Sequence, residues 1–127
     1  MKSFITHHNI MFMLYRSKKI YVDDSEIHGR GVFCSEPIKA GEILEECHFF
    51  TLPENVEYPQ ILKDHFFSWP KGEKGTLSIC LGFGSVFNHS DFNWNADWET
   101  DTKMNKFIFF ATRDINPGEE IFTNYKK

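Results

Sequence analysis

Three clusters of glycine and polar residues, far apart along the chain, carry residue types that bind small molecules; they are His28–Phe33, Gly84–Ser90 and Gly118–Tyr125. The glycines of the first cluster can make a tight turn or let a ligand approach the backbone closely. That cluster lacks the G-x-G-x-x-G spacing and the lysine of nucleotide-phosphate loops, so a phosphate site is not supported. Asn88 and His89 offer directed donors and acceptors to an adenine or amino-acid group, although a polar turn capped by Asn88 explains them equally well.

The third cluster contains two neighbouring carboxylates and a tyrosine near the end of the sequence. Adjacent residues of a strand face opposite ways, so Glu119 and Glu120 do not form an acid–base pair. We expect Glu119 to be solvated and Glu120 to have a structural role. Tyr125, taken by itself, is typical of a packed aromatic residue with a solvated hydroxyl. The clusters become chemically interesting only if the fold brings them together.

The elements that must position these clusters are short strands within one domain, because 127 residues leave little room for a second core. Aromatic residues make up 17% of the chain, and 14 phenylalanines against 4 methionines favour strands over a helical bundle. Apolar runs bounded by turn residues predict strands at Ile20–Val22, Gly31–Phe33, Glu42–Glu46, His48–Leu52, Thr76–Leu81, Phe107–Ala111 and Glu120–Thr123. In Tyr58–Trp69 the apolar spacing predicts a helix, so we expect a mostly-β fold with one short helix inserted near its middle.

Charge and cysteine content limit the partners. The net charge of −4 disfavours direct nucleic-acid binding and suits a basic peptide. The 3 cysteines are widely spaced, which argues against disulfides and zinc sites and favours a reducing intracellular compartment, cytoplasmic or nuclear. The apolar run Ile10–Leu14 is too short to cross a membrane, so no membrane association is expected.

In combination, four motifs resemble the SET-domain protein lysine methyltransferases. They are G-x-G-V-F at Gly29–Phe33, I-x-x-G-E-x-(I/L)-x-E at Ile38–Glu46, N-H-S at Asn88–Ser90, and G-E-E-(I/L)-x-x-x-Y at Gly118–Tyr125. Each motif is weak by itself, but their order over nearly the whole chain is specific. The resemblance implies a SET-domain fold of small curled β-sheets, with the C-terminal segment threaded beneath a loop as a pseudoknot.

The resemblance also implies an activity, the transfer of a methyl group from S-adenosylmethionine to a lysine side chain of a protein, with a histone tail as one candidate substrate. An alternative is an inactive SET-like module that only binds proteins. A metal-dependent hydrolase is not supported, because the H-E-x-x-H and G-x-S-x-G patterns are missing from the sequence. By resemblance, the cofactor is held by His28, Gly29, Arg30, Gly31, Asn88 and His89, Tyr125 is catalytic, the lysine channel involves Phe66, Phe83 and Thr123, and no residue binds a metal.

The sequence departs from the family pattern in two places. The N-H-S triplet is followed by one extra residue and no proline, so the equivalent of the family's next asparagine is Asn95. Many family members continue into a cysteine-rich zinc segment that closes the lysine channel, and we expect Lys126 and Lys127 not to do so. We expect an N-terminal extension at 1–19 and a single SET domain at 20–127 with an insert at about 51–80. The channel would then be open, or be closed by the extension or by the partner of a homodimer.

Overall fold

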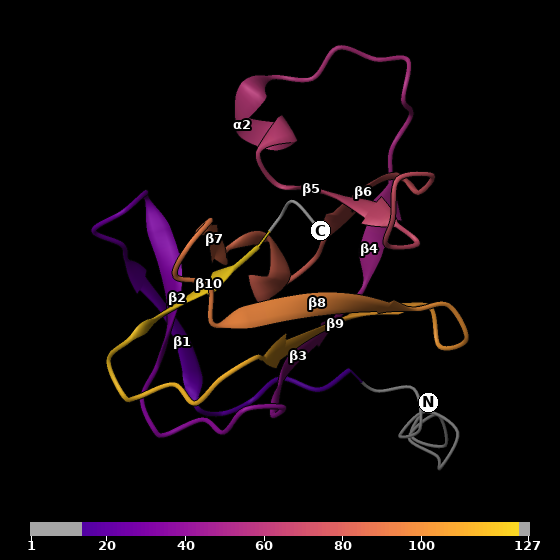
Figure 1. Cartoon of the computed structure of the whole chain (residues 1–127). Helices are drawn as coiled ribbons and strands as arrows, with labels where there is room; N and C mark the ends of the chain where they lie inside the picture. The colour runs from indigo at the N-terminus through magenta and orange to yellow at the C-terminus, as the bar shows by residue number, and fades with distance from the viewer. Residues whose placement is uncertain (1–13, 125–127) are drawn as a thin grey trace, which may run out of the picture.

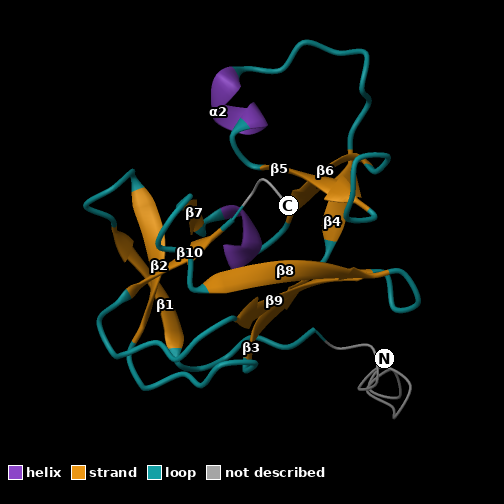
Figure 2. Ribbon diagram, in the orientation of Figure 1, coloured by secondary structure: helices purple, strands orange, loops and turns teal. Residues whose placement is uncertain are grey.

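The computed structural model describes residues 14–124, which form three small β-sheets with little helix (Figures 1 and 2). Tyr125 therefore lies outside the described residues. The first sheet has four strands in the order β1-β2-β10-β7. Their bounds are β1 Ile20–Asp24, β2 Arg30–Cys34, β10 Glu120–Thr123 and β7 Asn88–His89.

The position of β10 in this sheet brings distant parts of the chain together. It pairs antiparallel with β2 on one side and parallel with β7 on the other. A strand from the end of the chain therefore lies between a strand from its beginning and one from its middle (Figure 1). All three predicted clusters consequently meet in one sheet.

The other two sheets have three strands each, in the orders β3-β9-β8 and β4-β6-β5. The bounds are β3 Ile43–Cys47, β9 Lys106–Ala111, β8 Ala96–Asp101, β4 Phe49–Thr51, β6 Thr76–Cys80 and β5 Phe66–Trp69. Buried and half-buried residues alternate strictly along β9, so Phe107, Phe109 and Ala111 face the core. A single turn of 3-10 helix, η2 at Phe83–Ser85, precedes β7.

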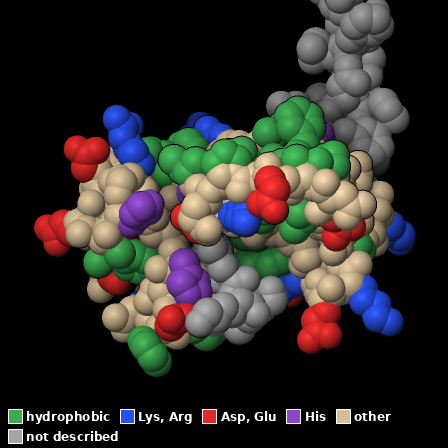
Figure 3. Space-filling model, turned by 90° about the horizontal axis from the view of Figure 1, so that it is seen from above, with side chains coloured by type: hydrophobic (Ala, Val, Ile, Leu, Met, Phe, Trp, Pro, Cys, Tyr) green, Lys and Arg blue, Asp and Glu red, His purple; other side chains and the backbone are tan. Residues whose placement is uncertain are grey.

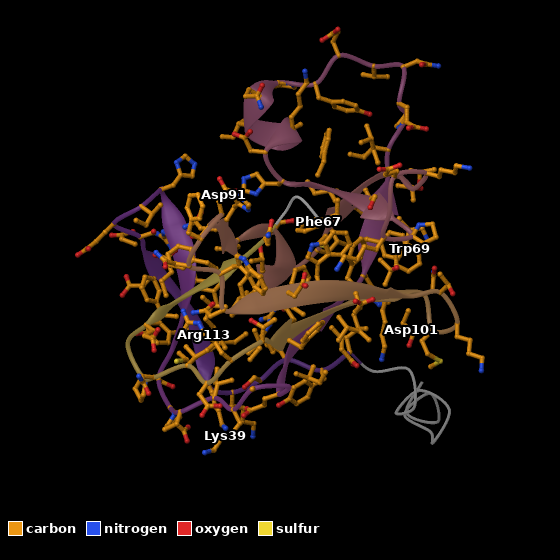
Figure 4. The ribbon with its side chains drawn as sticks, viewed as in Figure 1. Lys39, Phe67, Trp69, Asp91, Asp101 and Arg113 are labelled. Carbon is orange, nitrogen blue, oxygen red and sulfur yellow. The ribbon has the colours of Figure 1, made fainter. Side chains whose placement is uncertain are left out.

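Several large buried side chains form an aromatic cluster where the β4-β6-β5 sheet meets β8 and β9. We define this aromatic cluster as Phe67, Trp98, Phe107 and Phe109. The ring of Phe67 lies 5.0 Å from Trp98, 5.6 Å from Phe107 and 5.8 Å from Phe109. Figure 4 shows Phe67 and Trp69, which belong to β5, above β8 in the view. The insert is thus attached to the domain by aromatic packing.

The seven predicted strands are present, and the mostly-β SET fold is confirmed. The predicted helix over Tyr58–Trp69 is wrong in extent. Only α2, Gln60–Lys63, is helical, and the residues from Phe66 onward form β5, which pairs antiparallel with β6. The apolar spacing did not reflect a buried helix face, because Ile61 is 72% exposed and Leu62 40%. Pairing with β6, which local spacing does not encode, decided the structure of Phe66–Trp69.

Residues just before β1 pack on β3. The Ser17 N–H donates to the Leu44 carbonyl at 2.9 Å, and the Glu46 N–H donates to the Tyr15 carbonyl at 2.7 Å.

Within residues 14–124 there is no helix of the length and apolarity that spanning a membrane requires. Seen from above, the molecule shows hydrophobic side chains gathered on its surface (Figure 3), and the exposed ones of the insert include Val56, Ile61 and Leu62.

Candidate functional site

The loop between β1 and β2 is closed by its own short hydrogen bonds. The Ser25 N–H donates to the Gly29 carbonyl at 2.8 Å. The Ser25 hydroxyl oxygen accepts the N–H groups of Ile27 at 3.0 Å and His28 at 3.3 Å. Gly29 has a φ of +50°, and a Cβ there would meet no atom within 4 Å. The loop therefore presents exposed backbone in a conformation that glycine adopts at little cost.

Asn88 joins this loop to the middle of the chain. Its Nδ2 lies 3.0 Å from the His28 carbonyl oxygen, 3.1 Å from that of Arg30 and 2.8 Å from Glu120 Oε2. Two amide hydrogens are thus shared among three acceptors. Asn88 is buried, so these bonds form where water competes little for them. The amide nitrogen of Asn88 fixes the path of the loop.

Glu120 completes this arrangement from the last strand. Its second oxygen, Oε1, accepts the Ser25 hydroxyl at 2.7 Å. Gly31 lies directly against the same carboxylate: a Cβ on Gly31 would overlap Oε2 and would lie 2.8 Å from Cδ and 3.1 Å from Asn88 Nδ2. A glycine is thus required at position 31 because the Glu120 carboxylate lies close to its Cα, and not because the chain turns there. We call Ser25, Asn88, Glu120 and the loop Ile27–Gly31 the polar network.

The neighbouring carboxylate, Glu119, has different contacts. Its Oε1 accepts the Asn116 N–H at 2.8 Å, and Oε2 lies 3.8 Å from Arg113 Nη1. Glu119 closes the turn before β10, while Glu120 points into the polar network. The two carboxylates thus have separate roles.

Asn95 holds the C-terminal strand β10 in place. Its Nδ2 donates to the Glu120 carbonyl at 3.0 Å, and its Oδ1 accepts the Phe122 N–H at 2.8 Å. Its own N–H donates to the Phe122 carbonyl at 3.0 Å. Asn95 is only 1% exposed, so its hydrogen bonds to β10 are shielded from water and fix the position of that strand. Asn95, which the sequence predicts as the equivalent of the family's next asparagine, is thus a residue that fixes the C-terminal strand.

His89 and Thr123 lie beside each other where β7 pairs with β10. The His89 Nε2 is 2.7 Å from Asp91 Oδ1, and Asp91 lies beyond β7 (Figure 4). Thr123 is fully buried, and its hydroxyl has no hydrogen-bond partner among the described residues. A buried hydroxyl without a hydrogen-bond partner costs free energy, so a polar group of a ligand that bonded to it would be stabilised there.

A second polar cluster lies on the other side of η2. Glu45 is 2% exposed, and its Oε2 lies 2.6 Å from Arg16 Nε and accepts the Phe83 N–H at 3.2 Å. The Cys47 thiol donates to Glu45 Oε1 at 3.1 Å. Burial, and then the charge of Glu45, raise the pKa of Cys47 and of Cys80, so both remain thiols. This cluster ties residues before β1 to the helix that leads into β7.

The structure brings together five of the predicted cofactor residues, namely His28, Gly29, Arg30, Gly31 and Asn88, and places His89 next to Asn88. The three predicted channel residues lie in separate elements, Phe66 in β5, Phe83 in η2 and Thr123 in β10. Phe66 packs edge-on against Tyr58 with ring centres 5.1 Å apart, and the Arg16 guanidinium lies 3.8 Å above the Phe83 ring.

Sequence reasoning missed Ser25, which no motif marked. It also missed the pair of Arg16 and Glu45. Each makes contacts with residues at least 29 positions away, so no local pattern signals them. Among residues 14–124, no group of three His, Cys, Asp or Glu side chains is placed to hold a metal ion.

Three comparisons with known proteins agree with this arrangement. The family model of the SET domain matches residues 29–126. A histone-lysine N-methyltransferase of Schizosaccharomyces pombe, described as specific for H3 lysine-37, is 33% identical over 108 residues, which cover 82% of this chain and 71% of that protein.

The fold comparisons give the same result. A crystal structure of a Plasmodium falciparum protein assigned as a histone methyltransferase superposes with a TM-score of 0.68 at 34% identity, and the match covers 86% of this chain and 94% of that one. The Neurospora histone lysine methyltransferase DIM-5 has the same fold, with a TM-score of 0.68 at 20% identity over 88% of this chain and 54% of its own.

The three small sheets thus have the fold of a SET-domain protein. The chain belongs to the SET-domain family. This membership confirms the function class predicted from the sequence, protein-lysine methyltransferase.

Proposed function

We propose that this protein transfers a methyl group from S-adenosylmethionine to a lysine amine of a protein substrate, with a histone tail as the candidate substrate. The observation that carries the proposal is the Asn88 amide, which joins the carbonyls of His28 and Arg30 to Glu120 and so assembles the predicted cofactor residues in one place. The S. pombe relative, which acts on histone H3, supports the choice of substrate.

The residues present fit such a cofactor. The loop at Gly29 offers open backbone, and a ligand can approach it without meeting a side chain. The hydroxyl of Thr123, which has no hydrogen-bond partner among residues 14–124, lies two residues before the predicted catalytic Tyr125 in the sequence. Glu120 adds a carboxylate for which the described residues provide no ion-pair partner. Polar backbone, a buried hydroxyl and an unbalanced negative charge together suit a cationic amino-acid derivative of a nucleoside.

In this proposal the protein acts mainly by alignment. When bound, S-adenosylmethionine supplies a methyl group on a positively charged sulfur, so the charge only moves to the acceptor nitrogen and no strong acid or base is needed at that step. The loop and Asn88 would hold the cofactor, and Tyr125 would orient the neutral lysine amine by hydrogen bonding. Alignment of this kind can contribute on the order of 7–11 kcal/mol. Free lysine has a pKa of about 10.4, so an apolar channel would also help by favouring loss of its proton.

Partners and location follow from the same proposal. The net charge of −4 favours association with a lysine-rich segment through long-range attraction. We propose an intracellular location, cytoplasmic or nuclear, where such a substrate occurs. A homodimer is proposed as one way to close the lysine channel, and direct binding of nucleic acid or of a membrane is not expected.

The test is methyl transfer from labelled S-adenosylmethionine onto a panel of histones and basic peptides. We expect label on lysine, and a loss of roughly a hundredfold in kcat for Tyr125→Phe, because a misplaced acceptor forfeits alignment. Tyr21→Phe is the matched control, because Tyr21 stacks on Phe33 at the outer edge of the first sheet and should retain full activity. Cofactor binding without transfer to any substrate would instead support the binding module, and a lack of cofactor binding would overturn the proposal.

A further inference from the structure

Arg16 lies before the part of the chain that the SET family model matches, which begins at residue 29. Its Nε nevertheless lies 2.6 Å from Oε2 of Glu45, a carboxylate that is only 2% exposed. Among residues 14–124 this is the only ion pair that Glu45 forms. Leaving a buried carboxylate without its cation costs free energy, so the position of Glu45 depends on Arg16.

Arg16 and Glu45 together hold Phe83, the first residue of η2. The Phe83 N–H donates to Glu45 Oε2 at 3.2 Å, and the Arg16 guanidinium lies 3.8 Å above the Phe83 ring. The contact is tightly packed, because a Cβ on Gly82 would lie 2.9 Å from Glu45 Oε2 and 3.1 Å from Arg16 Nη2. The ion pair therefore fixes the start of η2 through both the backbone and the side chain of Phe83.

The other end of η2 leads directly to Asn88. The Phe83 carbonyl accepts the N–H groups of Val86 at 2.7 Å and of Phe87 at 3.2 Å. The residue that Glu45 holds thus also holds the two residues that precede Asn88. An unbroken series of contacts therefore runs from Arg16 to the strand β7.

Tight packing on the core side of η2 leaves little room for it to shift. A Cβ on Gly84 would lie 2.8, 2.9 and 3.0 Å from side-chain atoms of Phe109, Cys80 and Cys47. Phe87 is fully buried and stacks on Phe109 with ring centres 5.0 Å apart. A close-packed interior transmits displacements, so a movement of Phe83 would reach Asn88.

We propose that Arg16 is a positioning residue, which fixes Asn88 through Glu45 and Phe83 and so shapes the loop predicted to hold the cofactor. Asn88 is the residue whose amide joins the polar network together. This inference rests on the proposed function and extends the site to a segment that precedes the matched family region. Because Arg16 acts through other residues, its loss should weaken ligand binding without abolishing it.

The experiment measures the dissociation constant of S-adenosylhomocysteine by titration calorimetry. For Arg16→Ala we expect about tenfold weaker binding, a size typical of residues that affect a site without touching the ligand. Arg16→Lys keeps a cation beside Glu45 and over the Phe83 ring, so its constant should stay within about threefold of that of the unmodified protein. Arg16→Gln can still donate a hydrogen bond to Glu45 and should fold even if Arg16→Ala does not, and we expect its constant to lie between the other two.

Lys106→Ala is the matched control, because it removes an ion pair from the next residue of the same strand. Lys106 Nζ lies 2.7 Å from Glu46 Oε2, and both side chains are 17% exposed. This pair joins β3 to β9 and does not involve η2. We expect Lys106→Ala to lower the free energy of unfolding in urea, as Arg16→Ala does, but to leave the dissociation constant unchanged.

Hydrogen exchange of the ligand-free protein tests the path itself. In Arg16→Ala the N–H groups of Val86 and Phe87 should exchange at least about tenfold faster, because the segment before Asn88 opens more readily, whereas in Lys106→Ala they should not. Unchanged exchange in Arg16→Ala would contradict the path through Phe83. If Arg16→Ala left the affinity unchanged, or if Lys106→Ala weakened it equally, the positioning role would be overturned while the proposed function stood. If the unmodified protein bound no ligand, the proposed function would fall, and with it the role of Arg16 in binding.

Discussion

The polar network and the aromatic cluster hold this small domain together in different ways. The network joins Ser25, Asn88 and Glu120 by directed hydrogen bonds, and the first and last of these are 95 residues apart in sequence. The aromatic cluster joins the insert to β8 and β9 by ring contacts at 5.0–5.8 Å, with no directional bond among the rings. We therefore expect the aromatic cluster to contribute mainly to stability and the network mainly to the geometry of the site.

The largest effect on stability is expected from the aromatic cluster. Phe67→Ala would remove a ring that is 4% exposed and leave a cavity among Trp98, Phe107 and Phe109. We expect the free energy of unfolding to fall by about 3–5 kcal/mol, measured by urea denaturation. Phe50→Ala is the matched control at the other edge of the same sheet, because Phe50 is 60% exposed and its removal should change stability by only about 0.5 kcal/mol. Equal losses for the two variants would contradict the division of roles.

The same division explains what the sequence could predict. Apolar runs bounded by turn residues located seven of the ten strands within residues 14–124, because such runs are a local property of the sequence, as in β9. The strands β5, β7 and β8 were not predicted. Local spacing failed at Phe66–Trp69, where pairing with β6 outweighed a helix-like pattern. The glycine and N-H-S motifs marked Gly31 and Asn88 as site residues, and the structure brings them together.

The motifs did not reveal which residues the site residues contact. Ser25 lies outside every motif, yet its hydroxyl bonds to Glu120 and supports two loop N–H groups. Arg16 lies in the predicted extension but pairs with the buried Glu45. Such contacts depend on the position of β10 between β2 and β7 and on the packing of the residues before β1 on β3, which no short window of sequence encodes. The roles predicted for Tyr125, for the cofactor residues and for the three channel residues stay predictions.

An intermediate effect is expected at Gly31, and it should appear mainly in ligand binding. Gly31→Ala would push the new methyl group into the Glu120 carboxylate. We expect a loss of stability of about 1–3 kcal/mol from overpacking, together with at least about a tenfold loss of affinity for S-adenosylhomocysteine because the loop must shift. Both quantities can be measured on one preparation, by urea denaturation and by calorimetry.

Gly29→Ala is the comparison within the same loop. Gly29 has a positive φ of +50° but no atom within 4 Å of a new Cβ, so the cost is backbone strain of about 1–2 kcal/mol without a clash. If Gly29→Ala reduced ligand affinity more than Gly31→Ala, close packing against Glu120 would not be what shapes the loop.

The smallest effect is expected at an ion pair outside both regions, which provides a baseline for the comparison. Lys19 Nζ lies 3.0 Å from Glu42 Oε2, near the start of β3. Burial acts to raise the pKa of the Glu42 carboxyl, but the Lys39 N–H and Lys19 outweigh it, and the pKa is lowered overall. The hydrogen bond to Glu42 raises the pKa of Lys19.

The sign of the pH dependence follows from these directions. A carboxyl whose pKa is lower in the folded protein stabilises the fold above its unfolded pKa of about 4.3, and this contribution disappears as the pH falls through the folded value. Glu42→Gln should therefore lower the melting temperature slightly at pH 7 and leave it equal to that of the unmodified protein near pH 3. Melting curves of the two proteins across this range check the prediction, and a difference that grew towards low pH would show that Glu42 does not stabilise the fold as a carboxylate. Because both side chains of the pair are partly exposed, the difference at pH 7 should also shrink in high salt, whereas the loss caused by Phe67→Ala should not.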